Sequence, residues 1–479
     1  MADNIRNKSI KGVLWSLLEN FSLKGIQFVI NVIMARLLLP EDYGIVAIIF
    51  VFIAISQIFI DGGFATTLIQ DKNKTERDFA TVFTFNIAIS IVCYLILFVC
   101  APYISLFYNN DITLYLRVQS LGMIIYSLSS IHKVRMTIAV NFKSIAKVTL
   151  ISALVSGCVG IILAYNGLGV WALIVQYLMS AALTTALYTW FQKWKPVCFF
   201  DISSFKRLYP FGARLLAASI IDRIYMNLYP IFIGKFYTPA QLGYYSRAEQ
   251  FSALPAVSCT DVFMRVTYPV MSSINDENQL VRVYRKFISL SSFVIIPVIL
   301  AILLLAKPIV LMLLTEKWIE IIPLMQILCI GFILDHISAI NRNLLYVKGR
   351  ADLALKLEVI KKVTAISILL ASLAFGLIGL CVGKATYGII AAFLNSYYTK
   401  SLINVSIFAQ IKDYGSSLFV GLVSVLVGSI VYFYIDADWA QFLGGGLIFI
   451  ISYIGISYLL KIKPFIMSVD LVKEKIRRK

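Results

Sequence analysis

The stretch Arg36-Leu-Leu-Leu-Pro40-Glu-Asp-Tyr-Gly44 ends one long apolar segment and begins the next. Proline and glycine at this spacing are typical of a tight reversal, and an acidic pair lies between them. The same construction returns at Lys235-Phe-Tyr-Thr-Pro239-Ala-Gln-Leu-Gly243, 199 residues later (239 − 40). A single Pro-x-x-x-Gly is a weak signal, because proline and glycine open many turns. Two copies in matching helical hairpins indicate that a half-chain was duplicated.

The composition predicts the fold class. The chain of 479 residues is 60% hydrophobic, well above the roughly 45–50% of soluble domains. A run of about 20 mostly apolar residues can span a bilayer, and such runs fill the sequence. We therefore expect an all-α, polytopic membrane protein. The net charge is +18. Because the basic residues lie mainly in the loops, we interpret them as determinants of membrane topology. No nucleic acid is expected as a partner.

Fourteen apolar segments are predicted to be transmembrane helices. They cover residues 12–38, 43–69, 79–107, 113–139, 144–165, 168–192, 209–236, 240–271, 287–314, 318–346, 352–375, 378–402, 413–435 and 438–460.

Charge in the connecting loops alternates. Loops such as Glu41-Asp42 and Asn109-Asn110-Asp111 contain almost no basic residues. Because basic loops stay in the cytoplasm, the alternation places both termini there and requires an even number of spans. The loops and tail on the predicted cytoplasmic side contain Arg6, Lys8, Lys11; Lys72, Lys74, Arg77; Lys133, Arg135, Lys143, Lys147; Lys193, Lys195, Lys206, Arg207; Arg282, Arg285, Lys286; Lys348, Arg350, Lys356, Lys361, Lys362; Lys400, Lys412; and Lys461, Lys463, Lys473, Lys475, Arg477, Arg478, Lys479.

The longest polar connection, Lys193–Arg207, marks the expected boundary between two halves. We predict a six-helix lobe over residues 1–195 and a second over residues 196–405. Residues 406–479 would supply two extra helices and a basic cytoplasmic tail. With six spans in each half, both halves start on the same side of the membrane. The repeat is then parallel, and the functional cleft is expected between the lobes.

Three motifs near the start of the chain resemble a known family. Trp15-Ser-x-x-Glu19, Gly25-Ile-Gln27-Phe and Ala35–Gly44 are similar to the opening of Wzx-type polysaccharide and O-antigen flippases. These belong to the polysaccharide transport family of the multidrug/oligosaccharidyl-lipid/polysaccharide exporter superfamily. Within it, the chain resembles the branch of colanic acid and teichuronic acid exporters.

The resemblance implies a V-shaped, two-lobed transporter in the inner (cytoplasmic) membrane. Such a protein moves undecaprenyl-diphosphate-linked oligosaccharide to the periplasmic leaflet by alternating access. The product would enter lipopolysaccharide, capsule or exopolysaccharide biosynthesis. A polymerase and other polysaccharide-assembly proteins are candidate partners.

Charged residues inside the predicted spans are the candidate substrate contacts, because a charge in the membrane normally faces a cavity or a partner. Lys24 matches Arg223 under the 199-residue offset. Arg247 and Arg265 are 18 residues apart, which is five full turns, so they share one helix face. Arginine can hold phosphate oxygens with two parallel hydrogen bonds. We therefore predict that the diphosphate and anionic sugars bind Lys24, Arg214, Arg223, Arg247 and Arg265.

A structural interpretation of the same residues stays open. Asp222 or Glu249 could neutralise a neighbouring arginine for packing alone, and Arg265 could extend to the membrane surface.

Acidic residues within the spans are candidates for coupling to a Na⁺ or H⁺ gradient. Glu19 and Asp61 lie in the first hairpin and could meet across it, and Asp335 with His336 forms the second candidate group. A structural ion pair is the alternative in each case. No other cofactor is expected. His132 and His336 are the only histidines and lack metal-ligand spacing, so no metal site is predicted.

Two other function classes remain as alternatives. A multidrug-type small-molecule/cation antiporter of the same fold is the alternative transporter, although such exporters typically have twelve spans. An integral-membrane polymerase or glycosyltransferase would need a large external loop or a cytoplasmic domain with positioned carboxylates. The short loops favour neither enzyme, and we expect a transporter without catalytic residues.

Overall fold

The computed structural model describes residues 22–477, and every regular element within them is helical. This confirms the all-α class expected from the composition. The described chain forms two compact units, the first ending at Gly243 and the second beginning at Tyr244. The division falls beyond residue 195 because α8 and α9 pack against α2, α3 and α4 of the first unit. The proposed repeat boundary near residue 195 concerns duplication rather than packing, and it stays a prediction.

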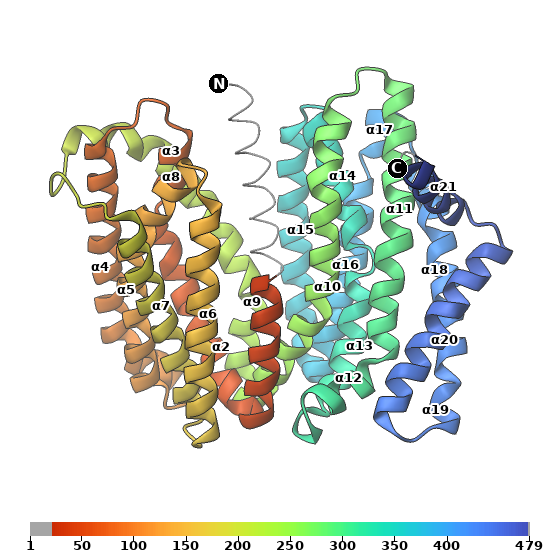
Figure 1. Ribbon diagram of the computed structural model, residues 1–479, viewed down its shortest axis with the longest axis horizontal. Coiled ribbons are helices and arrows are strands. Elements are labelled where there is room, and N and C mark those ends of the chain that lie inside the picture. Colours follow the sequence, from red (N-terminus) through yellow and green to blue (C-terminus); the bar gives the residue numbers. More distant parts are fainter. Residues whose placement is uncertain (1–21, 478–479) are drawn as a thin grey trace. The chain divides into compact units, whose positions relative to one another are not determined.

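The first unit packs its helices around apolar side chains from distant parts of the sequence. Ile49, Leu97 and Met123 join α2, α4 and α5 in one cluster, and Phe64 and Leu208 join α3 to α8 in another. In chain order (Figure 1), the unit contains the helix over residues 22–37, α2 (Pro40–Asp61), α3 (Phe64–Gln70), α4 (Glu76–Tyr108), α5 (Thr113–Ile138), α6 (Phe142–Tyr165), α7 (Val170–Gln192), α8 (Ile202–Met226), α9 (Leu228–Phe236) and the start of α10 (Pro239–Ser272).

The second unit has one large core, in which Ile288 and Ile296 of α11 pack with Cys329 of α13 and Leu344 of α14. It contains the rest of α10, followed by α11 (Glu277–Leu304), α12 (Ala306–Leu313), η1 (Glu316–Trp318), α13 (Ile321–Phe332), α14 (Asp335–Val347), α15 (Ala351–Ser372), η2 (Leu373–Phe375), α16 (Gly376–Ser396), α17 (Thr399–Ile403), α18 (Ile407–Ser429), α19 (Val431–Tyr434), α20 (Asp438–Leu459) and α21 (Lys463–Arg477).

Several segments expected as single helices are interrupted. The predicted span 43–69 is divided into α2 and α3 at Gly62 and Gly63, whose φ angles of 51° and 71° are left-handed. Glycine adopts this conformation without steric cost, so the pair can end one helix and begin the next. Asn227 separates α8 from α9, and Leu305 separates α11 from α12.

The described chain is a multi-pass membrane protein. Nine helical segments within residues 22–477 are long and apolar enough to cross a membrane. One of them, residues 351–403, includes two of the predicted spans. The predicted spans over 113–139, 209–236 and 240–271 are not among the nine, and the span 12–38 lies partly outside the described residues. The count of fourteen therefore stays a prediction.

The two Pro-x-x-x-Gly turns lie against each other within the first unit. A Cβ atom built on Gly44 would lie 1.7 Å from the carbonyl oxygen of Pro239. A Cβ atom built on Gly243 would lie 1.9 Å from the carbonyl oxygen of Pro40. Each glycine thus packs against the proline of the other copy. Reciprocal contacts of this kind are expected for two segments related by a twofold axis. The contact supports the duplication predicted from the sequence and places both turns at the same end of the helices.

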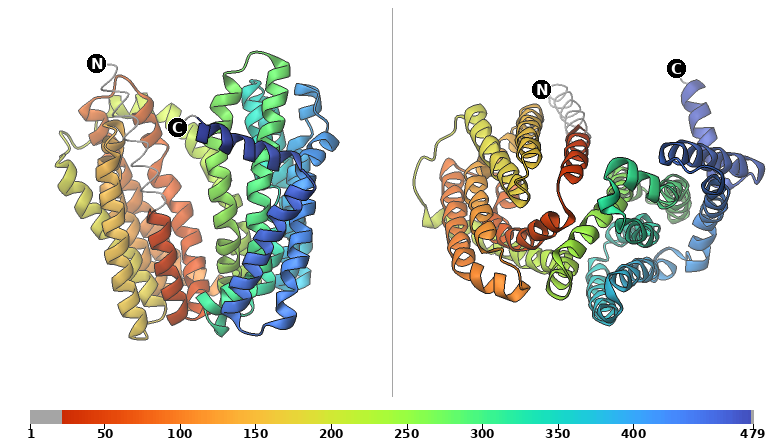
Figure 2. Two further views of the ribbon diagram at one scale, coloured as in Figure 1. Left: turned by 45° about the vertical axis from the view of Figure 1, so that its right-hand side comes forward. Right: turned by 90° about the horizontal axis from the view of Figure 1, so that it is seen from below.

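The chain after α20 forms a helix that the sequence analysis did not predict. Residues 406–479 were expected to end in a basic tail. Instead, α21 follows α20 after a short turn and lies across the end of the long helices of the second unit (Figure 2). Its start is anchored by Ile462, which is buried beside Val420 of α18 and Tyr453 of α20.

Candidate functional site

Two of the cations predicted to contact substrate lie in the first unit and have side chains that the structure describes. Lys24 is exposed on the helix over residues 22–37, and Arg223 is exposed near the end of α8. The side chain of Arg214 and all of Glu19 lie outside what the structure describes.

Asp61 is the last residue of α2, directly before the break at Gly62. The Gln57 side chain donates a hydrogen bond of 3.1 Å to its carboxylate. Lys133 of α5 and Arg223 of α8 both act electrostatically on Asp61. The structure therefore brings together Asp61 and Arg223, which the sequence analysis had assigned to separate roles. Lys133 was missed because its position near the end of an expected span placed it among the basic loop residues.

Arg247 and Arg265 lie on the face of α10 that points away from the core of the second unit. Tyr245, Ser252 and Thr267 are buried on the opposite face of this helix. Ser252 donates a hydrogen bond of 3.1 Å to the carbonyl of Met325 in α13 and thereby ties that face to the unit. At about 100° per residue, the two arginines point roughly half a turn away from these buried positions. Arg265 is exposed and Arg247 is half-buried.

Arg247 and the residues near it on α10 make several polar contacts. The Arg247 guanidinium donates to the side-chain oxygen of Gln250, one turn further along. Glu249, two residues after Arg247 and on the other side of the helix, pairs with Lys384 of α16. Lys384 also donates a hydrogen bond of 2.5 Å to the hydroxyl of Tyr245. This ion pair joins Glu249, which the sequence offered as a partner for a neighbouring arginine, to Lys384 of α16.

Asp335 and His336 are adjacent in sequence but face different surroundings. His336 is buried, and its Nε2 lies 2.9 Å from the hydroxyl of Ser292 in α11. Asp335 is exposed at the start of α14, where Arg342 and Lys361 act on it electrostatically.

Lys361 belongs to a charged group between α14 and α15. It lies 2.6 Å from Glu358, which is also 3.6 Å from Arg342. The Lys361 side chain is only 6% exposed, although the sequence analysis had placed it in a basic loop. Asp335 therefore lies beside an internal ion-pair group rather than sharing a site with His336.

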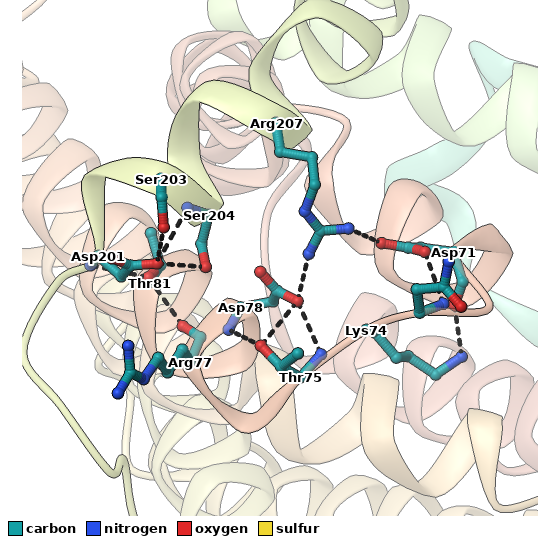
Figure 3. Close-up of polar contacts among 11 residues, drawn as sticks. Asp71, Lys74, Thr75, Arg77, Asp78, Thr81, Asp201, Ser203, Ser204 and Arg207 are labelled. Atoms are coloured by element: carbon teal, nitrogen blue, oxygen red, sulfur yellow. Dashed lines mark hydrogen bonds and ion pairs between the residues drawn. The ribbon is translucent and has the colours of Figure 1, made fainter.

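A second polar network holds the start of α8 (Figure 3). The Arg207 guanidinium bridges two carboxylates, Asp71 after α3 and Asp78 in the first turn of α4. Asp78 is buried and also accepts hydrogen bonds from the backbone N–H (2.7 Å) and hydroxyl (3.0 Å) of Thr75. The Thr75–Asp78 pair is a capping box that begins α4. One arginine of α8 thus joins this helix to the end of α3 and the start of α4.

Asp201 completes this network as the N-cap of α8 (Figure 3). Its carboxylate accepts hydrogen bonds from the hydroxyl of Ser203 (2.6 Å) and from the backbone N–H (3.0 Å) of Ser204. These bonds lower the pKa of the Asp201 carboxyl to about 2, so it is ionised at neutral pH. The backbone N–H of Asp201 donates to the hydroxyl of Thr81 in α4 at 3.0 Å. The network therefore fastens the connection before α8 to α4, and we assign it a structural role.

Among residues 22–477, no three or more histidine, cysteine, aspartate or glutamate side chains are close enough to hold one ion.

Comparisons with known proteins place the chain among polysaccharide-assembly proteins. The profile of the family described as "Polysaccharide biosynthesis protein" matches residues 33–323. The lipopolysaccharide biosynthesis protein WzxC of Escherichia coli K12 is 25% identical over 400 residues, covering 82% of this chain and 81% of WzxC. The teichuronic acid biosynthesis protein TuaB of Bacillus subtilis is 25% identical over 364 residues, covering 73% of this chain and 74% of TuaB.

The fold is similar to that of a solved flippase. The structure of the lipid II flippase MurJ in its inward closed conformation matches with a TM-score of 0.75. The match covers 94% of this chain and 100% of the MurJ chain at 17% sequence identity. At this identity the likeness shows the shared fold.

Proposed function

Because this chain belongs to the polysaccharide biosynthesis protein family, we propose that it is a flippase for undecaprenyl-diphosphate-linked oligosaccharide repeat units. It would move these units across the cytoplasmic membrane for lipopolysaccharide, capsule or exopolysaccharide biosynthesis. Both termini would lie in the cytoplasm, as the basic loops predict. The named functions of WzxC and TuaB in lipopolysaccharide and teichuronic acid biosynthesis support this proposal. A polymerase and other assembly proteins are its proposed partners, and the protein itself is proposed to catalyse no covalent step.

The observation that carries the proposal is the arginine face of α10. A cation facing lipid costs at least roughly 2.5–3.5 kcal/mol at the membrane centre. Arg247 and Arg265 lie on the face of α10 opposite its buried side, within the predicted span 240–271. A charge inside a span is retained where it meets a polar partner, a hydrated cavity or an anionic ligand, and Arg265 is exposed. A diphosphate supplies oxygens that match the guanidinium fork, and the polyprenyl tail can stay in lipid while the headgroup crosses.

Lys24, from the first copy of the repeat, and Arg214 and Arg223, from the second copy, are proposed to share this role. Under the 199-residue offset, Lys24 and Arg223 are equivalent positions, so a duplicated transporter presents one cation from each copy. The headgroup would bind these cations in turn as the two proposed lobes alternate between inward and outward access.

Asp61 is proposed to act as an exchangeable counter-ion of Arg223. Its charge partly offsets the electrostatic effect of Arg223 and Lys133, with which it interacts. A proton or Na⁺ bound to the carboxylate would remove that compensation and strengthen the attraction for a diphosphate. This mechanism would couple an ion gradient to substrate binding. Glu19 and Asp335 remain proposed coupling residues of the same kind.

Substitution of Asp61 by asparagine is expected to remove the dependence of export on an imposed Na⁺ or H⁺ gradient. The amide keeps the shape and the contact with Gln57 but binds neither ion. Glycan export from cells would be measured while each gradient is collapsed with an ionophore. Asp111→Asn, at an exposed loop position, is the matched control and should respond like the unaltered protein. An unchanged response in Asp61→Asn would exclude coupling at this residue.

Deletion of the gene tests the proposed function as a whole. We expect an undecaprenyl-diphosphate-linked oligosaccharide to accumulate in the cytoplasmic leaflet while the mature polysaccharide disappears from the surface. Mass spectrometry of extracted lipids would identify the intermediate and so the glycan. A strain that keeps its polysaccharides but becomes sensitive to small cationic drugs would instead support the antiporter alternative.

A further inference from the structure

The second unit contains a cationic cavity, and none of the residues proposed to contact the transported substrate lines it. It lies between the start of α11, the start of α18 and α21, and has a volume of about 310 Å³. Four cations and one carboxylate line it, giving a net charge of +3 (4 − 1). The charged lining residues are Arg282, Arg285, Lys286, Asp413 and Lys463.

Only part of this charge is compensated within the protein. Arg285 forms a forked pair with Asp413, in which Nε and Nη2 each lie 2.7 Å from a different carboxylate oxygen. Asp413 is buried, and Ser289 donates to its backbone carbonyl at 3.3 Å. The carboxylate is therefore held by Arg285. Lys286 and Lys463 are exposed at the cavity and remain positioned to bind an anion.

The position of the cavity favours a lipid over a free ion. Two candidate membrane spans, containing α11 and α18, begin beside it with basic residues, and α21 crosses the ends of the long helices of this unit (Figures 1 and 2). Val281 and Met467 give the cavity apolar walls beside the cationic ones. Phe465 of α21 packs on Phe293 of α11, with ring centroids 6.1 Å apart, so an apolar contact fixes α21 at this level.

We propose that this cavity binds the headgroup of an anionic glycerophospholipid at the membrane surface. The phosphodiester would contact Lys286, Lys463 and Arg282, while Val281 and Met467 contact the glycerol and the first acyl carbons. Basic pockets between transmembrane helices on the cytoplasmic side bind anionic lipid headgroups in other membrane proteins. The volume lies within the roughly 300–1,000 Å³ of small-molecule sites. Bound lipid would join α21 to α11 and α18 and stabilise the second unit.

Thermal unfolding of the purified full-length protein in a neutral detergent tests this proposal. Phosphatidylglycerol should raise the unfolding temperature in a saturable way, whereas phosphatidylcholine and inorganic phosphate should not. The double variant Lys286→Gln, Lys463→Gln should bind phosphatidylglycerol roughly tenfold or more weakly, because each lysine contributes to attraction by an anionic lipid. Lys356→Gln with Lys400→Gln, at exposed positions away from the cavity, should bind like the unaltered protein.

A second variant tests whether lipid binding depends on the volume of the cavity as well as on its charge. Met467→Trp should weaken phosphatidylglycerol binding by filling the cavity while leaving every cation in place. Equal affinity in the unaltered protein and the Lys286→Gln, Lys463→Gln variant would overturn the proposal. An equal response to inorganic phosphate and to phosphatidylglycerol would also overturn it, since the cavity would then be a simple anion site.

Discussion

Alanine at Gly44 or at Gly243 is expected to destabilise the protein by about 3 kcal/mol or more. The added Cβ atom would lie 1.7 Å from the Pro239 carbonyl oxygen in the first case and 1.9 Å from that of Pro40 in the second. These obstacles are backbone atoms, so no side-chain rotation relieves the clash. The two turns would have to separate. The unfolding temperature in detergent would measure the effect, together with the amount of protein that inserts into the membrane.

Two other glycines provide matched controls. Gly25 and Gly455 also lie in helices, and a Cβ atom built on either would meet no other atom within 4 Å. Alanine at these positions should be neutral or stabilise the protein by about 0.5–1 kcal/mol, since glycine lowers helix stability. If Gly44→Ala and Gly243→Ala behaved like these controls, the reciprocal contact between the turns would not exist in the folded protein.

Alanine at Arg223 or at Arg265 is expected to lower glycan export roughly ten- to hundredfold. Hydrogen bonds to charged groups contribute about 1.5–3 kcal/mol each, and neither substitution removes a buried apolar contact, because both side chains are exposed. Protein amount and membrane insertion should therefore stay unchanged. Surface polysaccharide in a complemented deletion strain gives the export rate, and immunoblotting of membranes gives the amount of protein.

Arginine-to-lysine substitutions and an arginine substitution elsewhere in the protein serve as controls for this prediction. Lysine at either position should restore export only partly, because an ammonium cannot form the paired contacts of a guanidinium. Arg77→Ala removes an exposed arginine in the first turn of α4 and should leave export unchanged. Full export by a variant lacking Lys24, Arg214, Arg223, Arg247 and Arg265 together would show that these cations serve only the structure.

The helices could be predicted from the sequence because their apolar segments are long and their ends carry recognisable residues. Pro40 begins α2, Thr75 and Asp78 cap α4, and Asp201 caps α8. The resemblance to polysaccharide exporters is confirmed by the family match over residues 33–323. The breaks within helices were not predicted, because a Gly-Gly pair such as Gly62-Gly63 is tolerated inside many membrane helices.

Contacts between helices could not be predicted from one sequence. Asp61, Lys133 and Arg223 lie on three helices separated by long stretches of chain, and no spacing rule connects them. Lys361 was placed in a loop, yet its side chain is buried against Glu358. The tail helix α21 was missed because its apolar residues are too few for a span, and only their packing on α11 and α20 shows that the segment is ordered.

Translocation of a labelled lipid in reconstituted vesicles is the decisive measurement of the proposed flippase activity. A fluorescent undecaprenyl-diphosphate oligosaccharide would be placed in the inner leaflet, and its arrival outside would be followed with a membrane-impermeant quencher. We expect protein-dependent translocation that is slowed roughly ten- to hundredfold by Arg265→Ala and unaffected by Arg77→Ala. Translocation no faster than in protein-free vesicles, with correctly folded protein present and an ion gradient imposed, would contradict the proposed flippase activity.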